Sequence, residues 1–340
     1  MAERKKIGLM GCGVVADYGH LPAILTTDGL ELAALYDPDP QALARLHARV
    51  PTAQVFTEAE PFYTCGLDAV SITSPVPVHL ANVSGAARHG LHVLCEKPLA
   101  MTDAEIEEMI AVMKQAGRML ATGFCYRFSP VAQRIKQILT EGWIGELRAM
   151  RLIYLWDLHG KWSYDASGNR FESPRRIGRF LEGGPMVDCG AHQIDLARWW
   201  TGSEIKRSVA AGAWVEEHDA PGHVWLHLDH ASGCHTMVEM SFSYSHTATE
   251  PADIFRYELI GTDGLIRYDR DGWRFEVRNS HGTTVLPGAS EKSFGGMYAA
   301  WRDALIAGAL GPMPSAEDGL IVTRLARTAT ESVMAERLVR

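Results

Sequence analysis

The sequence predicts an α/β protein of two domains, in which a parallel-sheet domain precedes an α/β domain with a mostly antiparallel sheet. Three observations support this prediction. Short apolar runs alternate with helical patterns over the first third of the chain, which is typical of βαβ units. Beyond Tyr126 the pattern changes to a period of two between Gly and Asp turns, which is typical of antiparallel strands. The 340 residues, 46% of them hydrophobic, are enough to bury two cores.

The first domain is expected to cover residues 1–124. Thr102 and Glu105 form a capping box, in which each side chain accepts a backbone N–H of the other residue, and Gly117 ends the helix that they begin. The remaining elements follow from apolar runs and their periodicity. We predict strands over 6–10, 30–36, 68–73, 91–95 and 119–124, and helices over 14–25, 78–89 and 102–115.

The second domain is expected to cover residues 125–340. Its strands show the alternation of a half-buried sheet, and its helices show longer apolar periods. We predict strands over 209–215, 224–228, 235–243 and 257–260, and helices over 130–139, 185–200, 296–307 and 317–337. No repeat or low-complexity linker separates the domains, so we expect them to pack together.

Composition excludes several classes of partner. The formal net charge of −8 and the pI near 6.0 provide no basic field for nucleic acid or for an anionic membrane. No apolar stretch is long enough for a signal peptide or a membrane span, so we expect a cytoplasmic protein. The six cysteines are scattered without a CxxC pair, and we predict neither a disulfide nor a zinc site.

The first functional motif follows the first predicted strand and opens a helix. Gly11 permits a tight turn, Gly13 allows close approach of a pyrophosphate to the helix N-terminus, and Ala16 keeps helix and strand close. This context predicts a dinucleotide-binding Rossmann domain, although a chance Gly-rich turn is the alternative. The predicted cofactor-binding residues of this loop are Gly11, Cys12, Gly13, Val14 and Val15.

Asp37 closes the second predicted strand, where a carboxylate can accept hydrogen bonds from the adenosine ribose. The next residues, Pro38-Asp39-Pro40, offer no Arg or Lys for a 2′-phosphate. We therefore predict NAD rather than NADP as the cofactor. An ordinary surface aspartate at the end of a strand is the alternative.

Glu96-Lys97-Pro98 follows the predicted strand over 91–95, at the sheet edge where parallel α/β folds bind ligands. Lys97 can reach a substrate hydroxyl there and stabilise a developing alkoxide; the alternative is a solvated surface lysine. His20 and His79 lie beside the predicted nucleotide site, where we expect packing or supporting roles. The further predicted cofactor-binding residues are Ser74, His79, Glu96 and Lys97.

The predicted helix over 185–200 carries a polar stripe. At 3.6 residues per turn, one face presents Asp188, His192, Asp195 and Trp199. A histidine has a suitable pKa to accept a hydroxyl proton near neutrality, so His192 is the predicted base, and Asp188 or Asp195 is expected to orient it. A buried structural network and a metal site are the alternatives.

Six segments together resemble a known family. They are Gly11 to Ala16, Leu91 to Leu99, Tyr126 to Pro130, Gly183 to Trp200, Ile260 to Gly264, and Pro314 to Gly319. In order and spacing they resemble the Gfo/Idh/MocA oxidoreductases, named for glucose-fructose oxidoreductase and inositol dehydrogenase. The resemblance implies a Rossmann domain, then an α/β domain with a large open sheet that packs face to face in homodimers or homotetramers. It also implies Lys97, Asp188 and His192 as the catalytic set.

The segment between Leu155 and Leu181 has no family pattern, so we expect it to choose the substrate. Its aromatic and polar side chains suit a polyol, although an aromatic-rich loop can simply pack on the sheet. The predicted substrate-binding residues are Lys97, Tyr126, Arg127, Trp156, Trp162, Asp188 and His192. Arg175, Arg176 and Arg179 suit an acidic sugar, but we expect a solvated basic loop.

Four further histidines, at 223, 227, 230 and 235, resemble a metal cluster in the printed sequence. His223 and His227 are about 13 Å apart along a strand at about 3.3 Å per residue, so we predict no metal site.

The motifs together predict an NAD-dependent dehydrogenase that acts on a CH–OH group of a sugar, cyclitol or related polyol. Two alternatives remain open at this point. One is a redox-neutral enzyme that oxidises transiently, eliminates a leaving group and so cleaves glycosides. The other is a non-catalytic nucleotide-binding sensor.

Overall fold

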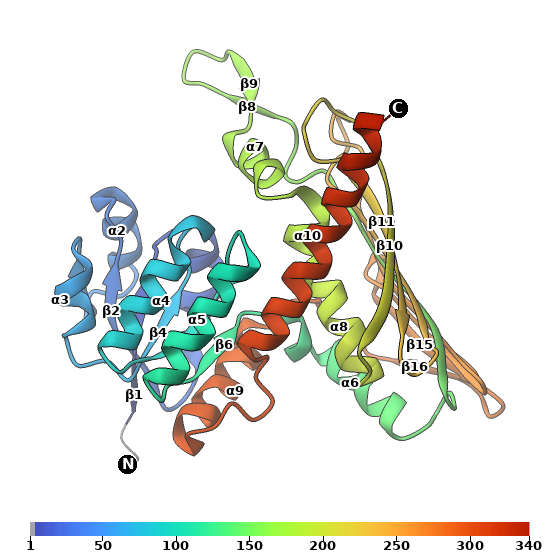
Figure 1. Ribbon diagram of the computed structural model, residues 1–340, viewed down its shortest axis with the longest axis horizontal. Coiled ribbons are helices and arrows are strands. Elements are labelled where there is room, and N and C mark those ends of the chain that lie inside the picture. Colours follow the sequence, from blue (N-terminus) through green and yellow to red (C-terminus); the bar gives the residue numbers. More distant parts are fainter. Residues whose placement is uncertain (1–3, 340) are drawn as a thin grey trace. The chain divides into compact units, whose positions relative to one another are not determined.

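Figure 1 shows the computed structural model of the chain, which describes residues 4–339. The chain forms two compact units. The first contains the residues up to 128 and also residues 292–321, and the second contains residues 129–291 and those from 322 onward. The assignment of cofactor binding to residues 1–124 and of substrate binding and oligomerisation to residues 125–340 stays a prediction.

A six-stranded parallel sheet forms the centre of the first unit and confirms the predicted Rossmann fold. Its order is β3-β2-β1-β4-β5-β6. Strands β1 to β3 extend the sheet toward one edge, and β4 to β6 extend it from β1 toward the other edge, so the strand order changes direction between β1 and β4. The strands are β1 (Lys5–Met10), β2 (Leu30–Tyr36), β3 (Gln54–Phe56), β4 (Ala69–Ile72), β5 (His92–Cys95) and β6 (Leu120–Thr122).

Helices and short helical turns complete the first unit. They are η1 (Ala16–His20), α1 (Leu21–Thr26), α2 (Pro40–His47), α3 (Ala59–Tyr63), η2 (Val76–Val78), α4 (His79–Arg88), α5 (Asp103–Gln115), η3 (Cys125–Phe128) and α9 (Phe294–Ala307). The capping box of α5 is present with both of its hydrogen bonds. Val70 and Val93 from the sheet pack with Ile106 and Met109 from α5 in one buried cluster, which fixes α5 on the sheet.

The second unit contains an eight-stranded, mostly antiparallel sheet, as expected. Its order is β10-β11-β12-β7-β13-β14-β15-β16, and among the described strand pairs of this sheet only β12–β7 is parallel. The strands are β7 (Leu147–Leu155), β10 (Ile205–Ala213), β11 (His223–His230), β12 (His235–Ser241), β13 (Ile254–Gly261), β14 (Gly264–Asp269), β15 (Arg274–Asn279) and β16 (Gly282–Leu286), and a separate hairpin pairs β8 (Trp162–Tyr164) with β9 (Arg170–Glu172).

Helices of the second unit line one side of the large sheet (Figure 1). Gly190 permits close packing there, because a Cβ at this position would lie 2.6 Å from Met186 Sδ and 3.2 Å from Met240 Cγ on β12. The helical elements are α6 (Pro130–Thr140), α7 (Pro174–Leu181), η4 (Met186–Gly190), α8 (Ala191–Thr201) and η5 (Asp271–Trp273), and α10 (Ala316–Val339) begins in the first unit and continues in the second.

The opposite face of this sheet is polar, with scattered exposed apolar side chains. Arg151 pairs with Glu258 across β7 and β13, at 3.0 Å. Val209 and Ile260 are each about half exposed on this face. No helix among residues 4–339 is long and apolar enough to cross a membrane.

Candidate active site

The glycine loop after β1 is fixed by contacts with two neighbouring strands. Gly11 has φ +103°, and a Cβ there would lie 2.5 Å from the Ser74 backbone nitrogen, so no other residue fits without movement. Its N–H donates to the Tyr36 carbonyl at the end of β2 over 2.8 Å. A Cβ on Gly13, in contrast, would meet no protein atom within 4 Å. The fold therefore requires glycine at 11 but not at 13.

Asp37, at the end of β2, lies beside this loop. Its Oδ2 accepts the Cys12 N–H over 2.7 Å, and its Oδ1 accepts the Asp39 N–H over 2.9 Å. Arg45 of α2 donates to the Cys12 carbonyl over 2.7 Å. The sequence prediction missed Arg45, because it considered only the residues directly after Asp37. Burial raises the pKa of the Cys12 thiol to about 12, so Cys12 stays protonated and unreactive.

These residues fit a bound dinucleotide. The open space around Gly13 admits a pyrophosphate beside the helix that follows, and the Asp37 carboxylate lies at the strand end where an adenosine ribose is bound in such folds. Val14, predicted to contact the cofactor, is half exposed beside the loop.

His79 joins the loops that follow β4 and β5. Its ring nitrogens lie 2.8 Å from the Ser74 carbonyl oxygen and 3.0 Å from the Leu99 carbonyl oxygen. The side chain is buried, and desolvation lowers its pKa. Asn82 donates to the Ser74 hydroxyl over 2.9 Å. His79 thus holds the loops that carry Ser74 and Lys97. Its predicted contact with the cofactor stays a prediction.

Lys97 follows β5 at the same edge of the sheet as the glycine loop. Its N–H donates to Glu96 Oε2 over 3.2 Å, the Lys97–Pro98 peptide is cis, and its side chain is partly exposed. Burial raises the pKa of Glu96, but the His20 hydrogen bond and the positive charges of His20 and Lys97 outweigh it, and the pKa lies below its ordinary value. Glu96 therefore carries a negative charge directly beside Lys97.

Tyr126 and Arg127 lie on the short helical turn η3 and are buried. Arg127 pairs with Asp318 over 3.3 Å within the first unit. Their burial favours a role in supporting the sheet edge. The predicted contact of Tyr126 and Arg127 with a substrate stays a prediction.

In the second unit, Asp188 and His192 lie on one helical segment that contains a π turn. Asp188 belongs to the π turn η4, His192 lies in the first turn of α8, and Gly202 ends α8 in the left-handed conformation at φ 59°. The sequence predicted a regular α-helix here, and that was wrong for residues 186–190, because 3.6-residue periodicity does not reveal a π turn. Asp188 is partly exposed, His192 is nearly buried and Asp195 is fully buried.

Arg179 of α7 lies close to this segment. It pairs with Glu182, and the negative charge of Asp188 is the main reason that the pKa of Arg179 exceeds its ordinary value. Arg176 is fully buried and pairs with Glu216, whereas Arg175 is exposed. The expectation of a solvated basic loop was therefore wrong for Arg176, whose charge is matched by a carboxylate that lies 40 positions further along the chain.

The two predicted substrate-binding tryptophans occupy different environments. Trp156 follows β7 and stacks on Tyr154, with ring centroids 5.3 Å apart. Trp162 lies on the hairpin of β8 and β9, where Arg170 is 4.2 Å from its ring centroid. Trp156 thus packs on the end of the sheet, and Trp162 is displayed on the hairpin that Figure 1 shows projecting from α7.

Two family models match the chain. One, described as the oxidoreductase family with an NAD-binding Rossmann fold, matches residues 5–124, and the GFO/IDH/MocA C-terminal domain matches residues 132–267. The chain belongs to the GFO/IDH/MocA oxidoreductase family. Members of this family are oxidoreductases with an NAD-binding Rossmann fold, and the relatives of this chain are dehydrogenases that act on CH–OH groups.

Individual similar proteins are consistent with membership of the GFO/IDH/MocA family. The D-apiose dehydrogenase of Paraburkholderia graminis is 29% identical over 84% of this chain and 73% of its own length. The D-glucoside 3-dehydrogenase of Escherichia coli is 29% identical over 61% of this chain and 56% of its own length. An Agrobacterium radiobacter oxidoreductase, solved with NAD+, L-tartaric acid and magnesium, shares the fold with a TM-score of 0.81 and 24% identity, over 98% of this chain and 97% of its own.

Among residues 4–339 of this chain, one cluster of side chains could bind a metal ion: Glu172, Glu216 and His218. Its central carboxylate is already neutralised. Glu216 pairs with Arg176 and, over 3.4 Å, with Lys161, and it accepts the Ser243 hydroxyl over 2.6 Å. Cations so close to the carboxylate oppose a metal ion, so the cluster is better described as a buried ion-pair network.

The four histidines between 223 and 235 do not converge on one point. His223 lies 3.1 Å from Glu239, and His230 lies 2.9 Å from the Thr236 hydroxyl. His227 and His235 form a pair with ring nitrogens 3.1 Å apart.

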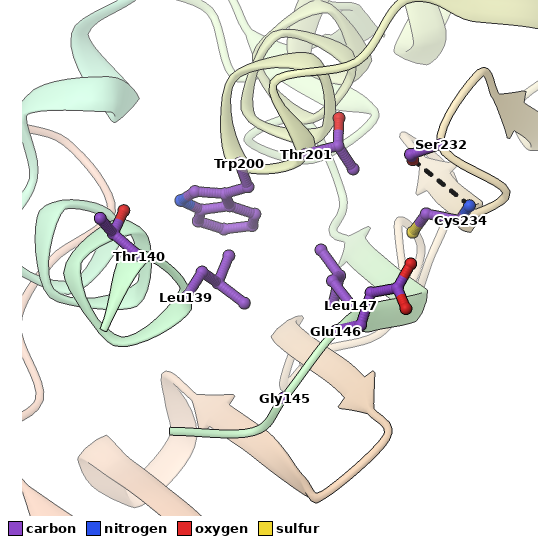
Figure 2. A pocket seen from close by; sticks show the side chains of 9 residues that line it. All are labelled: Leu139, Thr140, Gly145, Glu146, Leu147, Trp200, Thr201, Ser232 and Cys234. Carbon is purple, nitrogen blue, oxygen red and sulfur yellow. Dashed lines mark hydrogen bonds between the residues drawn. The ribbon is translucent and has the colours of Figure 1, made fainter. Parts of the chain in front are cut away.

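A pocket of about 300 Å³ lies elsewhere in the second unit, at the ends of α6 and α8 and the start of β7 (Figure 2). Its wall includes Leu139, Trp200 and Cys234, and none of the predicted site residues. The Thr140 and Thr201 hydroxyls donate to carbonyls of their own helices. Glu146 and Ser232 also line the pocket, so its wall combines polar and apolar groups.

Proposed function

We propose that the protein is an NAD-dependent dehydrogenase that transfers a hydride between nicotinamide and a secondary alcohol of a sugar, cyclitol or related polyol. The observation that carries the proposal is the shared sheet edge of the first unit. The glycine loop follows β1 there and Lys97 follows β5, so a cofactor site and a candidate catalytic cation lie at the carboxyl ends of the same parallel sheet.

The proposed roles follow from the chemistry of each side chain. The loop from Gly11 to Val15 and the Asp37 carboxylate would hold the dinucleotide, which accepts a hydride when bound. Lys97 would polarise the substrate hydroxyl and stabilise negative charge on its oxygen. His192 would accept the hydroxyl proton, and Asp188 would orient His192.

The relatives support the substrate class. The names of the two similar enzymes describe dehydrogenases for D-apiose and for a D-glucoside. We propose a small polyol or sugar as the substrate here, NAD as the cofactor, and a cytoplasmic homodimer or homotetramer as the active form.

Screening inositols, aldoses, uronic acids and glycosides tests the proposal, with NADH absorbance as the readout and NADP in parallel. With the substrate so identified, Lys97→Ala and His192→Ala should each lower kcat by about 10²- to 10⁴-fold, because a positioned proton-transfer group contributes about that much. Lys114→Ala, an exposed lysine on α5, is the matched control. Wild-type turnover in Lys97→Ala would refute the assigned roles. Turnover without net NADH would instead identify the redox-neutral alternative.

A further inference from the structure

A continuous row of buried polar side chains adjoins Lys97 in the first unit. Tyr298 Oη donates to Ser71 Oγ over 2.8 Å, and it lies 2.7 Å from His20 Nδ1. His20 Nε2 lies 2.8 Å from Glu96 Oε1, and Glu96 Oε2 accepts the Lys97 N–H over 3.2 Å. The row therefore links Ser71 on β4, Tyr298 on α9 and His20 on η1 to Glu96, which directly precedes Lys97.

The burial of this row is costly. The side chains of His20, Ser71 and Tyr298 are fully buried, and that of Glu96 is 11% exposed. A buried carboxylate and imidazole require partners to offset their desolvation, and apolar side chains of similar volume commonly stabilise a core as well or better. Stability alone thus gives little reason for these polar side chains in the core.

The hydrogen bonds in the row hold the His20 ring at both of its nitrogens. The Tyr298 hydroxyl lies between Ser71 Oγ and His20 Nδ1, so it can donate to one of them and accept from the other. The ionised Glu96 accepts from His20 Nε2–H.

Two local features of the sequence orient His20. It ends the π turn η1, whose extra residue per turn breaks the regular spacing of side chains along the helix. Gly19 lets the helix lie against Phe294, because a Cβ at position 19 would be 2.7 Å from the Phe294 ring. The centroid of the Phe294 ring lies 5.0 Å from the centroid of the His20 ring. Helix α9 thus supplies both Phe294 and Tyr298 to this site from a late part of the chain.

We propose that His20 and Glu96 are positioning residues for Lys97, and that Tyr298 and Ser71 anchor them. Glu96 fixes the Lys97 backbone through Oε2 and maintains a negative charge that acts on Lys97, and His20 holds the Glu96 carboxylate in place. This inference rests on the proposed function, because it explains how Lys97 is held for its reaction.

Electrostatic reciprocity gives the inference a measurable consequence. The charge of Lys97 helps to lower the pKa of Glu96, so the charge of Glu96 must favour the protonated form of Lys97 by the same interaction. An ammonium donates a hydrogen bond to a substrate oxygen and stabilises negative charge on it, whereas a neutral amine stabilises that charge much less.

The test measures the ionisation of Lys97 without any substrate. The full-length protein is labelled with trinitrobenzenesulfonate, which reacts with neutral amines, and modification of Lys97 is followed by peptide mass spectrometry from pH 6 to 11. Glu96→Gln should lower the apparent pKa of Lys97 by about one unit, because an opposite charge at close range shifts a pKa by about one to three units. His20→Leu removes the hydrogen bond that holds the Glu96 carboxylate in place and should shift the apparent pKa of Lys97 in the same direction by a smaller amount. His20→Gln, whose amide can still donate to Glu96, should shift it by less again.

Tyr63→Phe is the matched control, since it removes another buried hydroxyl of the first unit, which donates to the Asn82 carbonyl. Equal Lys97 profiles in wild type, Glu96→Gln, His20→Leu and Tyr63→Phe would overturn the inference. If one variant does not fold, as judged by circular dichroism, the other still decides the matter. The proposed function fails separately, through wild-type turnover in Lys97→Ala, because the labelling measurement uses neither cofactor nor substrate.

Discussion

At the scale of single residues, Asp37 and Arg45 place opposite charges beside the glycine loop. The Asp37 carboxylate would repel a 2′-phosphate, and Arg45 would attract one once that carboxylate is removed. Asp37→Ser should therefore raise the ratio of kcat/KM for NADP to that for NAD by at least about tenfold, or about 1.4 kcal/mol. Initial rates with both cofactors measure the ratio. Asp39→Ser is the control, because Asp39 only caps α2, and an unchanged ratio in Asp37→Ser would contradict the assignment of NAD.

Gly11 and Gly13 should respond differently to alanine. Gly11→Ala places a Cβ against Ser74 at a residue with a positive φ, so the free energy of unfolding should fall by about 1–3 kcal/mol. Gly13→Ala meets no protein atom within 4 Å and should leave the melting temperature unchanged while weakening NAD binding at least about tenfold. Thermal melts and NAD titrations by fluorescence separate the two effects. Unaltered NAD affinity in Gly13→Ala would argue against a pyrophosphate at this loop.

Local spacing was enough to name Gly11, Asp37 and Lys97 as candidate site residues, because each belongs to a motif of a few residues beside a recognisable strand. It did not predict the partners that give these residues their environment. Arg45 reaches the loop because α2 turns back toward it, and His20 meets Glu96 across 76 positions of sequence. Such contacts are set by the packing of whole elements, which no short motif encodes.

At the scale of elements, periodicity identified most strands of the parallel sheet but missed several of the eight-stranded sheet, including the central and mostly buried strand β7. Strand β15 was not predicted either, since three of its residues, Arg274, Glu276 and Arg278, are charged. Glu276 is buried and pairs with both arginines. Strand β3 has three residues, too few for a pattern. Both π turns, η1 and η4, lie in the segments that carry His20 and Asp188, and π turns are common at functional sites.

Helix α7 is held by Arg176, whose guanidinium contacts Glu216 and donates to the Phe242 carbonyl over 2.6 Å. Arg176→Met should destabilise the protein by about 3–5 kcal/mol, because it leaves a buried carboxylate without its main partner. Denaturant unfolding measures the loss. Arg175→Met, an exposed neighbour on the same helix, should change stability little, and equal losses in the two variants would show that α7 does not depend on this pair.

The same pair should make stability depend on pH. Burial raises the pKa of Glu216, but hydrogen bonds from Arg176 and Ser243 and nearby positive charges bring it below its ordinary value. A carboxyl with a lowered folded pKa stabilises the fold above its unfolded pKa, and that contribution disappears as the pH falls through the folded value. Wild type should therefore lose stability below about pH 4.5 more steeply than Glu216→Gln, as measured by thermal melts between pH 3 and 7. Parallel curves would contradict this account.

At the scale of the whole molecule, the outer face of the eight-stranded sheet is the surface that we expect to join copies of the chain. Exposed apolar side chains lie among ion pairs there, as at an interface that is partly polar. Light scattering after gel filtration should give two or four times the chain mass of 37.4 kDa. Ile260→Glu, on this face, should shift the mass toward one chain, because it would bury an unpaired charge between copies. Ile306→Glu, at an exposed position on α9, should not. A wild-type mass of 37.4 kDa at micromolar concentration would reject this arrangement, and unchanged assembly of Ile260→Glu would place the contact elsewhere on the surface.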